Sequence, residues 1–178
     1  MNRLFAVLVC GLLAARLHAA PDSGPSAGSK LAALKATAAY GDDAGKEIDL
    51  TEKRKDKPTV FVFVRADKWD RPMYRFLRTL DEIVKKERDD MRVIAVWVSD
   101  DPDKSKEYLQ RAEATLKMME QTTFAYVGKE GPKDWNINSD AHLTAVVVEK
   151  GKVGASLGFT SVNETDAKDV LKKFEAKK

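Results

Sequence analysis

Thr59-Val60-Phe61-Val62-Phe63-Val64 is a continuous run of β-branched and aromatic residues, bounded by Pro58 on one side and by a charged segment on the other. Runs of this kind indicate a strand that is buried on both faces, as in parallel sheets covered by helices. We therefore expect residues 59–64 to form a central strand of an α/β sheet.

A helix is expected shortly after this strand. Pro72 suits the first turn of a helix, where a backbone N–H has no intrahelical partner. Beyond it, the apolar residues recur at spacings of three and four, which places them on one stripe. These residues are Met73, Phe76, Leu77, Leu80, Ile83 and Val84.

The pattern of a buried strand followed by a helix then repeats. Residues 92–98, Arg-Val-Ile-Ala-Val-Trp-Val, are expected to form a second buried strand. Asp103 is expected to cap a second helix, and residues 122–127 to form a third strand. The apolar stripe of the second helix consists of Tyr108, Leu109, Ala112, Leu116 and Met119.

The C-terminal part has the pattern of a β-hairpin. Residues 143–149 and 152–159 are strand candidates joined by the tight turn Lys150-Gly151, and a final helix is expected to begin at Asn163. Strands that alternate with helices imply parallel pairing with right-handed crossovers, and a hairpin adds an antiparallel edge. The sequence therefore predicts an α/β fold, a three-layer α/β/α sandwich around a mixed central sheet.

The segment before this core differs from it in composition. Residues 21–29 are rich in Pro, Ser and Gly and are expected to be a flexible lead-in, and residues 31–40 are expected to form one short helix. Gly45-Lys46-Glu47-Ile48-Asp49-Leu50 alternates apolar and polar residues, as a short strand does. We therefore assign residues 21–44 to the lead-in and residues 45–178 to the folded domain.

The first 20 residues have the pattern of a secretory signal, with a basic start, an apolar stretch over residues 4–15 and a small-residue exit at Ala19-Ala20. The apolar stretch has about a dozen residues, whereas a membrane-spanning helix needs about 20. We expect cleavage after Ala19 or Ala20, and an exported protein that is periplasmic or extracellular, with no membrane span. Cys10 is the only cysteine and lies inside this signal, and Val9 before it disfavours a lipid anchor there.

Charge and residue counts exclude several classes of function. The formal net charge of the chain is +3 and falls to +1 when Arg3 and Arg16 leave with the signal. A net charge this small does not indicate a nucleic-acid partner. After removal of the signal the chain has no cysteine and one histidine, His142, whereas a zinc site needs several such ligands. We expect neither a metal nor another cofactor.

The order of elements, with the arm at residues 45–50 ahead of the first buried strand, resembles the thioredoxin-like oxidoreductases of bacterial envelopes and their peroxiredoxin relatives. The resemblance runs from about Gly45 to the C-terminus and is a matter of pattern and order more than of identical residues. It implies a thioredoxin-like fold. It also implies a site on the turn after the first buried strand, where the family has Trp-Cys-x-x-Cys.

Both cysteines of that turn are replaced in this sequence. Trp69 and Pro72 match the motif, while Asp70 and Met73 stand at the two cysteine positions. The family also has a cis-proline before its fourth strand, and Leu143 stands at that position, where we expect an ordinary trans bond because a cis bond before a non-proline is costly. The resemblance therefore implies a protein without thiol–disulfide chemistry.

The candidate site is the rim formed by this turn and by the segment that faces it in the family. It comprises Lys68, Trp69, Asp70, Arg71, Pro72, Met73, His142, Leu143 and Thr144. Because the family's groove holds an extended peptide strand, we expect a non-catalytic binding or scaffold module with a protein or peptide partner.

Other roles compete with this hypothesis. Asp70 has the position of a helix cap, and Trp69 has the size of a residue that packs on its own domain. A non-thiol enzyme would use Asp67, Asp70 and His142 for acid–base work. A third hypothesis is an accessory subunit of a redox system, completed by a cysteine of its partner.

Overall fold

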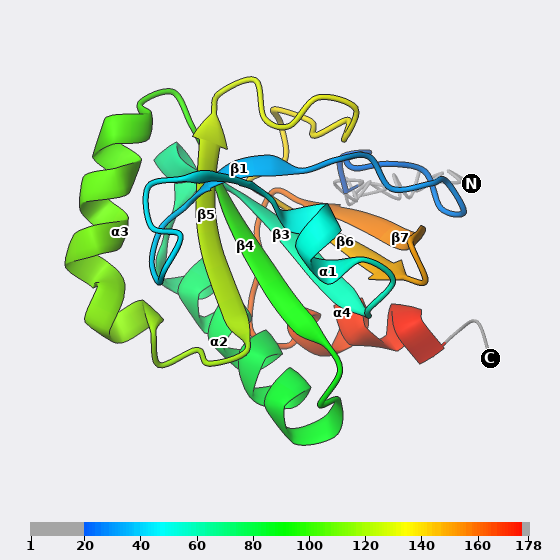
Figure 1. Cartoon of the computed structure of the whole chain (residues 1–178). Helices are drawn as coiled ribbons and strands as arrows, with labels where there is room; N and C mark the ends of the chain where they lie inside the picture. Colours follow the sequence, from blue (N-terminus) through cyan, green and yellow to red (C-terminus); the bar gives the residue numbers. More distant parts are fainter. Residues whose placement is uncertain (1–19, 176–178) are drawn as a thin grey trace, which may run out of the picture.

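The computed structural model describes residues 20–175, which form a seven-stranded mixed sheet and its covering helices (Figure 1). The strands are β1 Lys35–Ala38, β2 Glu47–Asp49, β3 Thr59–Arg65, β4 Arg92–Ser99, β5 Thr122–Gly128, β6 Leu143–Glu149 and β7 Lys152–Phe159. The helices are α1 Leu50–Arg54, α2 Arg71–Glu87, α3 Pro102–Leu116 and α4 Asp166–Glu175, with a short 3-10 turn at Ala66–Lys68. The predicted signal sequence up to Ala19, with Cys10, lies outside the described residues.

The centre of the sheet follows the sequence prediction. The strand order is β2-β1-β5-β4-β3-β6-β7, with β3, β4 and β5 parallel and β6 antiparallel to β3. The hairpin of β6 and β7 has the predicted bounds and forms one edge. The predicted mixed α/β sheet is therefore confirmed.

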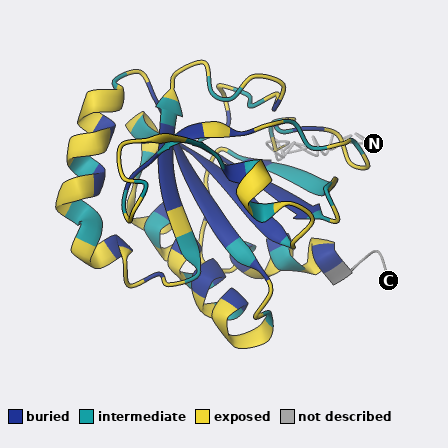
Figure 2. Ribbon diagram, in the orientation of Figure 1, coloured by how far each residue is buried: buried dark blue, intermediate teal, exposed yellow. Residues whose placement is uncertain are grey.

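The alternation of side chains along β3 separates two apolar cores. Val60, Val62 and Val64 face α2, α3 and α4, whereas Phe61 and Phe63 face the other side. On that side Trp135 packs against both phenylalanines, with ring centroids 5.1 and 5.0 Å apart. The short helix α1 completes this thinner layer, and Figure 2 shows the sheet strands buried between the two layers.

Residues 35–38 form a strand and not the predicted helix. Ala36 and Ala38 are buried, while Lys35 is exposed and Thr37 half-buried, so the burial alternates with the period of a strand. β1 pairs with β2 on one side and with β5 on the other. Pairing with the open edge of β5 outweighs the helix propensity of this alanine-rich segment, which is a weak preference.

Residues 21–29 also differ from the expected flexible lead-in, because they pack on β6 and β7. The Ser23 and Thr144 hydroxyl oxygens lie 2.6 Å apart in a buried hydrogen bond. The Ser156 hydroxyl donates to the Pro25 carbonyl at 2.6 Å. Gly158 leaves room for the chain, since a Cβ there would lie 2.2 Å from the Pro21 carbonyl oxygen. The folded unit therefore begins well before residue 45.

Two helices begin at other residues than predicted. Asp101 caps α3 through a hydrogen bond from the Lys104 backbone N–H, so the helix begins at Pro102 and not after Asp103. α4 begins at Asp166, because the Asn163 side chain accepts from the Thr165 backbone N–H and holds a turn before the helix. Within residues 20–175, no helix combines the length and the apolar character that crossing a bilayer requires.

Candidate functional site

The loop between β3 and α2 ends in a well-formed helix start. The Asp70 carboxylate accepts a hydrogen bond from the Met73 backbone N–H at 2.9 Å, which satisfies one of the free donors of the first turn. Pro72 lies in that first turn. Asp70 therefore caps the helix, which is the role that the sequence predicted as the alternative to a binding role.

Trp69 joins this loop to two other elements. Its indole ring packs against Trp97 of β4, with ring centroids 4.7 Å apart and an interplanar angle of 57°. Its Nε1–H donates to the Tyr108 hydroxyl oxygen of α3 at 2.6 Å. Trp97 is buried, whereas Trp69 and Tyr108 are half-buried. The three rings therefore form a fixed aromatic wall at the carboxyl ends of β3 and β4.

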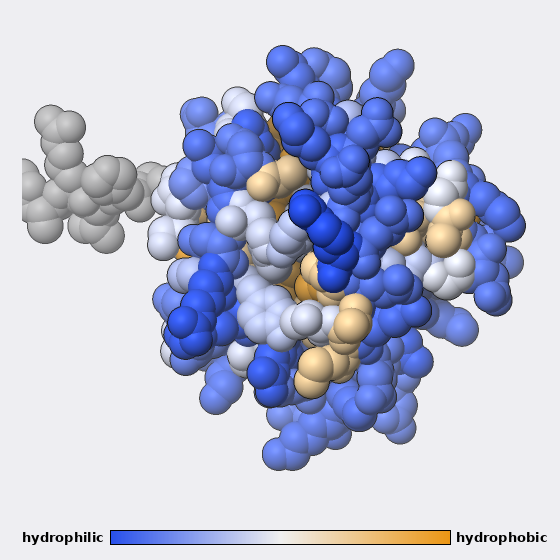
Figure 3. All heavy atoms as spheres, turned by 90° about the vertical axis from the view of Figure 1, so that its left-hand side faces the viewer, coloured by the Kyte–Doolittle hydropathy of each residue, from blue (hydrophilic) through white to orange (hydrophobic). Residues whose placement is uncertain are grey.

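A pocket of about 460 Å³ opens against this wall. Its lining consists of Ala66, Asp67, Trp69, Trp97, Ser99, Asp100, Asp101, Lys104, Ser105, Glu107, Tyr108 and Arg111. Figure 3 shows the side of the molecule on which α3 lies; it is largely hydrophilic, with small apolar patches between the polar side chains. We call this cavity the Trp69 pocket.

Some of the charged groups of the Trp69 pocket are paired within the protein. Asp67 accepts from Arg65 at 3.1 Å and lies 3.5 Å from the Lys68 ammonium; burial raises the pKa of Asp67, but these two cations outweigh burial and lower the pKa overall. The backbone and side-chain N–H groups of Lys104 lower the pKa of Asp101. Both carboxylates are therefore ionised at neutral pH.

Three other charged groups at the pocket have no such partner. Within residues 20–175, neither a hydrogen bond nor an ion pair involves the side chains of Asp100, Glu107 or Arg111. All three are exposed. They are the groups that a bound molecule would meet without displacing an existing partner.

No family model and no curated protein matches this sequence. Solved structures do resemble it. A DsbF homologue from Corynebacterium diphtheriae is 17% identical, with a TM-score of 0.57 over 81% of this chain and 85% of its own. The pneumococcal exposed lipoprotein thioredoxin Etrx1 from Streptococcus pneumoniae is 17% identical, with a TM-score of 0.55 over 81% and 99%. Peroxidoxin BcpB from Mycobacterium tuberculosis is 14% identical, with a TM-score of 0.57 over 86% and 99%.

The chain has a thioredoxin-like fold. At these identities the likeness concerns the fold alone. The sequence holds a single cysteine, Cys10, so this thioredoxin-like protein lacks the active-site cysteine pair. The bond before Leu143 is trans, as expected, since no peptide bond within residues 20–175 is cis. Nor does any group of three or more His, Cys, Asp or Glu side chains in those residues form a metal site.

Part of the candidate rim is core of the thioredoxin-like domain and corrects the sequence prediction. Met73, Leu143 and Thr144 are 2%, 0% and 1% exposed, so their side chains are not at the surface. Met73 lies on the stripe by which α2 packs on the sheet. Leu143 and Thr144 lie in β6, which is paired on both sides, by β3 and β7.

The remaining rim residues lie at one end of the sheet but do not converge on one pocket. Lys68, Arg71 and Pro72 are exposed, and His142 is half-buried. The His142 carbonyl accepts from the Arg65 backbone N–H at 3.0 Å, which places residues 139–142 beside the end of β3. Within the described residues, however, the lining of the Trp69 pocket includes no residue of 139–144.

The groups of the acid–base hypothesis are not assembled. Asp70 is engaged as a helix cap, and Asp67 is paired with Arg65 and Lys68. Of Asp67, Asp70 and His142, only Asp67 lines the Trp69 pocket. No observation in residues 20–175 therefore favours this combination.

The sequence prediction missed the α3 side of the Trp69 pocket. The sequence predicts Tyr108 in the core stripe of its helix, Trp97 in a buried strand and Asp100 in a solvated loop, and it does not single out Glu107 or Arg111. One signal could have found them. The carboxyl ends of neighbouring parallel strands meet at one edge of the sheet, so the loops after β3 and β4 had to be adjacent.

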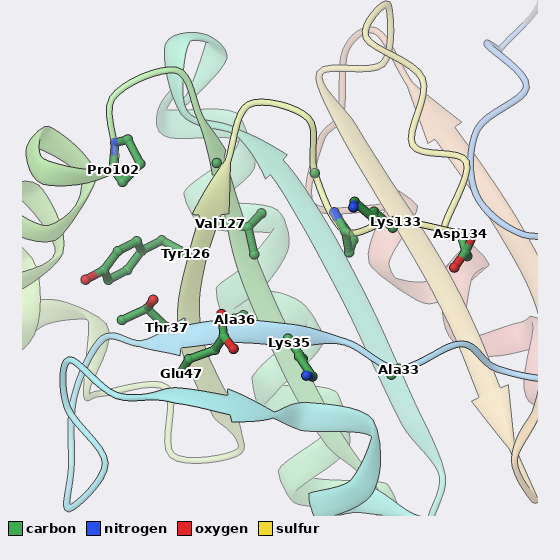
Figure 4. Close-up of a pocket in the computed structure, with 13 residues that line it drawn as sticks. Ala33, Lys35, Ala36, Thr37, Glu47, Pro102, Tyr126, Val127, Lys133 and Asp134 are labelled. Atoms are coloured by element: carbon green, nitrogen blue, oxygen red, sulfur yellow. The ribbon is translucent and has the colours of Figure 1, made fainter.

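A second pocket, of about 500 Å³, lies between β1, the end of β5 and residues 131–134 (Figure 4). Its charged lining is balanced, with Lys35 and Lys133 against Glu47 and Asp134. Pro102 lines it, whereas Asp101 and Lys104 line the Trp69 pocket, so the start of α3 separates the two cavities. Only the Trp69 pocket has an aromatic wall at the position that the sequence singled out.

Proposed function

We propose that this protein is a redox-inactive, exported thioredoxin-like module that binds a polypeptide segment of a partner at the Trp69 pocket. Thiol–disulfide exchange requires a thiolate, and residues 20–178 contain no cysteine. The observation that carries the binding role is Trp69 itself. It is a half-buried indole that lines an open pocket while its position is held by Trp97 and Tyr108.

The size and lining of the Trp69 pocket support binding. A volume of about 460 Å³ falls within the range of about 300–1,000 Å³ that is usual for ligand sites. Tryptophan, tyrosine and arginine are the residues most enriched among interface hot spots, and all three line this cavity. A held indole also loses little side-chain entropy when a partner binds.

Export is supported by the N-terminal sequence. The pattern of residues 1–20 is that of a secretory signal, and one structural neighbour is named as a pneumococcal exposed lipoprotein. Mass spectrometry of the protein from its native host should find an N-terminus at Ala20 or Pro21. An intact Met1, or a lipid mass on Cys10, would refute this part of the proposal.

Site-specific photo-cross-linking tests the binding role. A photoreactive phenylalanine derivative replaces Lys104, which lies at the Trp69 pocket with its side chain 83% exposed. The matched control carries it at Lys86, an exposed residue in the last turn of α2, at the other end of that helix from the Trp69 loop. We expect a discrete protein adduct in native cells at position 104 and none at position 86. Equal adducts at both positions, or none at either, would contradict the proposal.

A further inference from the structure

The charged lining of the Trp69 pocket is not balanced. Four carboxylates line it against two cations, and the carboxylates are those of Asp67, Asp100, Asp101 and Glu107. The lining residues therefore carry a formal net charge of −2, whereas the chain without its signal carries +1. The pocket has the opposite sign from the molecule that surrounds it.

Among the lining residues that the structure describes, two carboxylates and one cation have no partner. Asp101 is paired with Lys104 at 3.1 Å, and Asp67 is paired with Arg65 and Lys68. Asp100 and Glu107 have no partner within residues 20–175, and Arg111 is the one unpaired cation of the lining in those residues. A cation that enters the pocket therefore meets two free carboxylates, while an anion meets one free guanidinium.

The aromatic wall suits the same kind of ligand. The faces of Trp and Tyr rings carry negative electrostatic potential and attract cations within about 6 Å of the ring centroid. The hydrogen bond between Trp69 and Tyr108 and the contact between Trp69 and Trp97 fix the indole before a ligand arrives. An ordered aromatic face beside free carboxylates is the arrangement that recognises organic cations.

We propose that the Trp69 pocket selects an arginine or lysine side chain of the partner polypeptide. This inference rests on the proposed function and names the side chain that the site prefers. The guanidinium or ammonium group would lie against the Trp69 face and between the carboxylates of Asp100 and Glu107, with the aliphatic stem along the aromatic wall. Attraction between exposed charges weakens with ionic strength, so this preference is salt-dependent.

Titration calorimetry with blocked pentapeptides Gly-Gly-X-Gly-Gly tests the preference, where X is Arg, Lys, norleucine or Glu. The mature protein should bind the Arg and Lys peptides about tenfold or more tightly than the norleucine peptide, and the Glu peptide most weakly. Raising the salt concentration from about 0.05 to about 0.5 M should reduce the affinity for the Arg peptide and leave that for norleucine nearly unchanged.

Substitutions that change the charge of the lining show whether negative charge there strengthens binding of the Arg peptide. Glu107→Gln and Asp100→Asn should each weaken binding of the Arg peptide several-fold. Arg111→Gln should strengthen it, because it removes the only unpaired cation of the lining. Glu87→Gln is the matched control; Glu87 is exposed at the far end of α2, and its substitution should change nothing. All four residues are exposed, so folding is little affected.

The outcomes separate this inference from the proposed function. Tighter binding of norleucine than of Arg, or weaker binding by Arg111→Gln, overturns the cation preference and leaves the binding role in place. If no peptide binds while position 104 still cross-links a partner, the cation preference is again overturned and the binding role stays in place. No peptide binding together with no adduct at position 104 overturns both.

Discussion

The Trp69 Nε1–H donates a hydrogen bond to the Tyr108 hydroxyl at 2.6 Å, across 39 positions of sequence. This contact joins the loop after β3 to α3 and defines one wall of the Trp69 pocket. Tyr108→Phe keeps the ring and removes the acceptor. It should lower the free energy of unfolding by about 1 kcal/mol, as measured by urea denaturation.

A double-mutant cycle isolates this bond. Trp69→Phe removes the donor and also reduces packing against Trp97. If the bond contributes as stated, adding Tyr108→Phe to Trp69→Phe should cost little more than Trp69→Phe alone. Full additivity of the two losses would show that the contact contributes nothing to stability.

The buried carboxylate of Asp81 should make the stability of the fold depend on pH. Asp81 is 3% exposed, and its carboxylate accepts from the Gln121 backbone N–H at 2.8 Å and the Thr122 hydroxyl at 2.7 Å. Burial raises the pKa of Asp81 in the folded state, and the two hydrogen bonds lower it only in part. The contribution of this group to stability is therefore largest below its unfolded pKa of 3.8 and is lost as the pH rises through the higher folded pKa.

Asp81→Asn tests this sign. The amide oxygen can still accept both hydrogen bonds but carries no charge. The variant should therefore be more stable than the parent at pH 7, and this difference in stability should be smaller near pH 3. Asp81→Ala should instead lose about 1–3 kcal/mol, because it leaves the Gln121 N–H without its acceptor. Thermal melts across this pH range decide; a parent and an Asn variant with parallel pH profiles would refute the assignment.

Gly158 predicts how firmly residues 21–29 are held. A Cβ at this position would lie 2.2 Å from the Pro21 carbonyl oxygen, so Gly158→Ala must displace the N-terminal segment. We expect a loss of about 1–3 kcal/mol and faster proteolytic cleavage within residues 21–29. Gly128→Ala is the control, since nothing lies within 4 Å of its Cβ position. Equal stability of the two variants would mean that the segment is not packed as described.

The absence of a thiol makes a biochemical prediction. The mature protein should not reduce insulin disulfides, and thiol titration of the denatured protein should give zero, because Cys10 lies in the predicted signal. Activity that persists through further purification and scales with the protein concentration would refute redox inactivity.

Local patterns in the sequence predicted the centre of the fold but not the surroundings of the site. The run of residues 59–64 and the Lys150-Gly151 turn specify β3 and the hairpin because strand burial and turn geometry depend on neighbouring residues. The strand at residues 35–38 depends on the distant open edge of β5, which no local pattern reveals.

The sequence predicted the part of the candidate site that lies in the loop after β3, but not the part that α3 contributes. Trp69 follows from its place after β3, and the cap at Asp70 from its place before Pro72. Whether Leu143 and Thr144 are exposed depends on β3 and β7 pairing on both sides of β6. The contact of Trp69 with Tyr108 joins elements 39 positions apart, and it depends on how α3 packs beside the loop after β3, which residue spacing does not determine.

Nitrogen-15 NMR of the indole signals tests the central claim most directly, because the three tryptophans report on different places. Trp69 and Trp97 both line the pocket, Trp69 half-buried and Trp97 buried, whereas Trp135 is buried on the opposite face of the sheet. On titration with Gly-Gly-Arg-Gly-Gly, the Trp69 signal should shift most, the Trp97 signal less, and the Trp135 signal not at all. A shift of Trp135 as large as that of Trp69, or a bound peptide with no change at Trp69, would contradict the account.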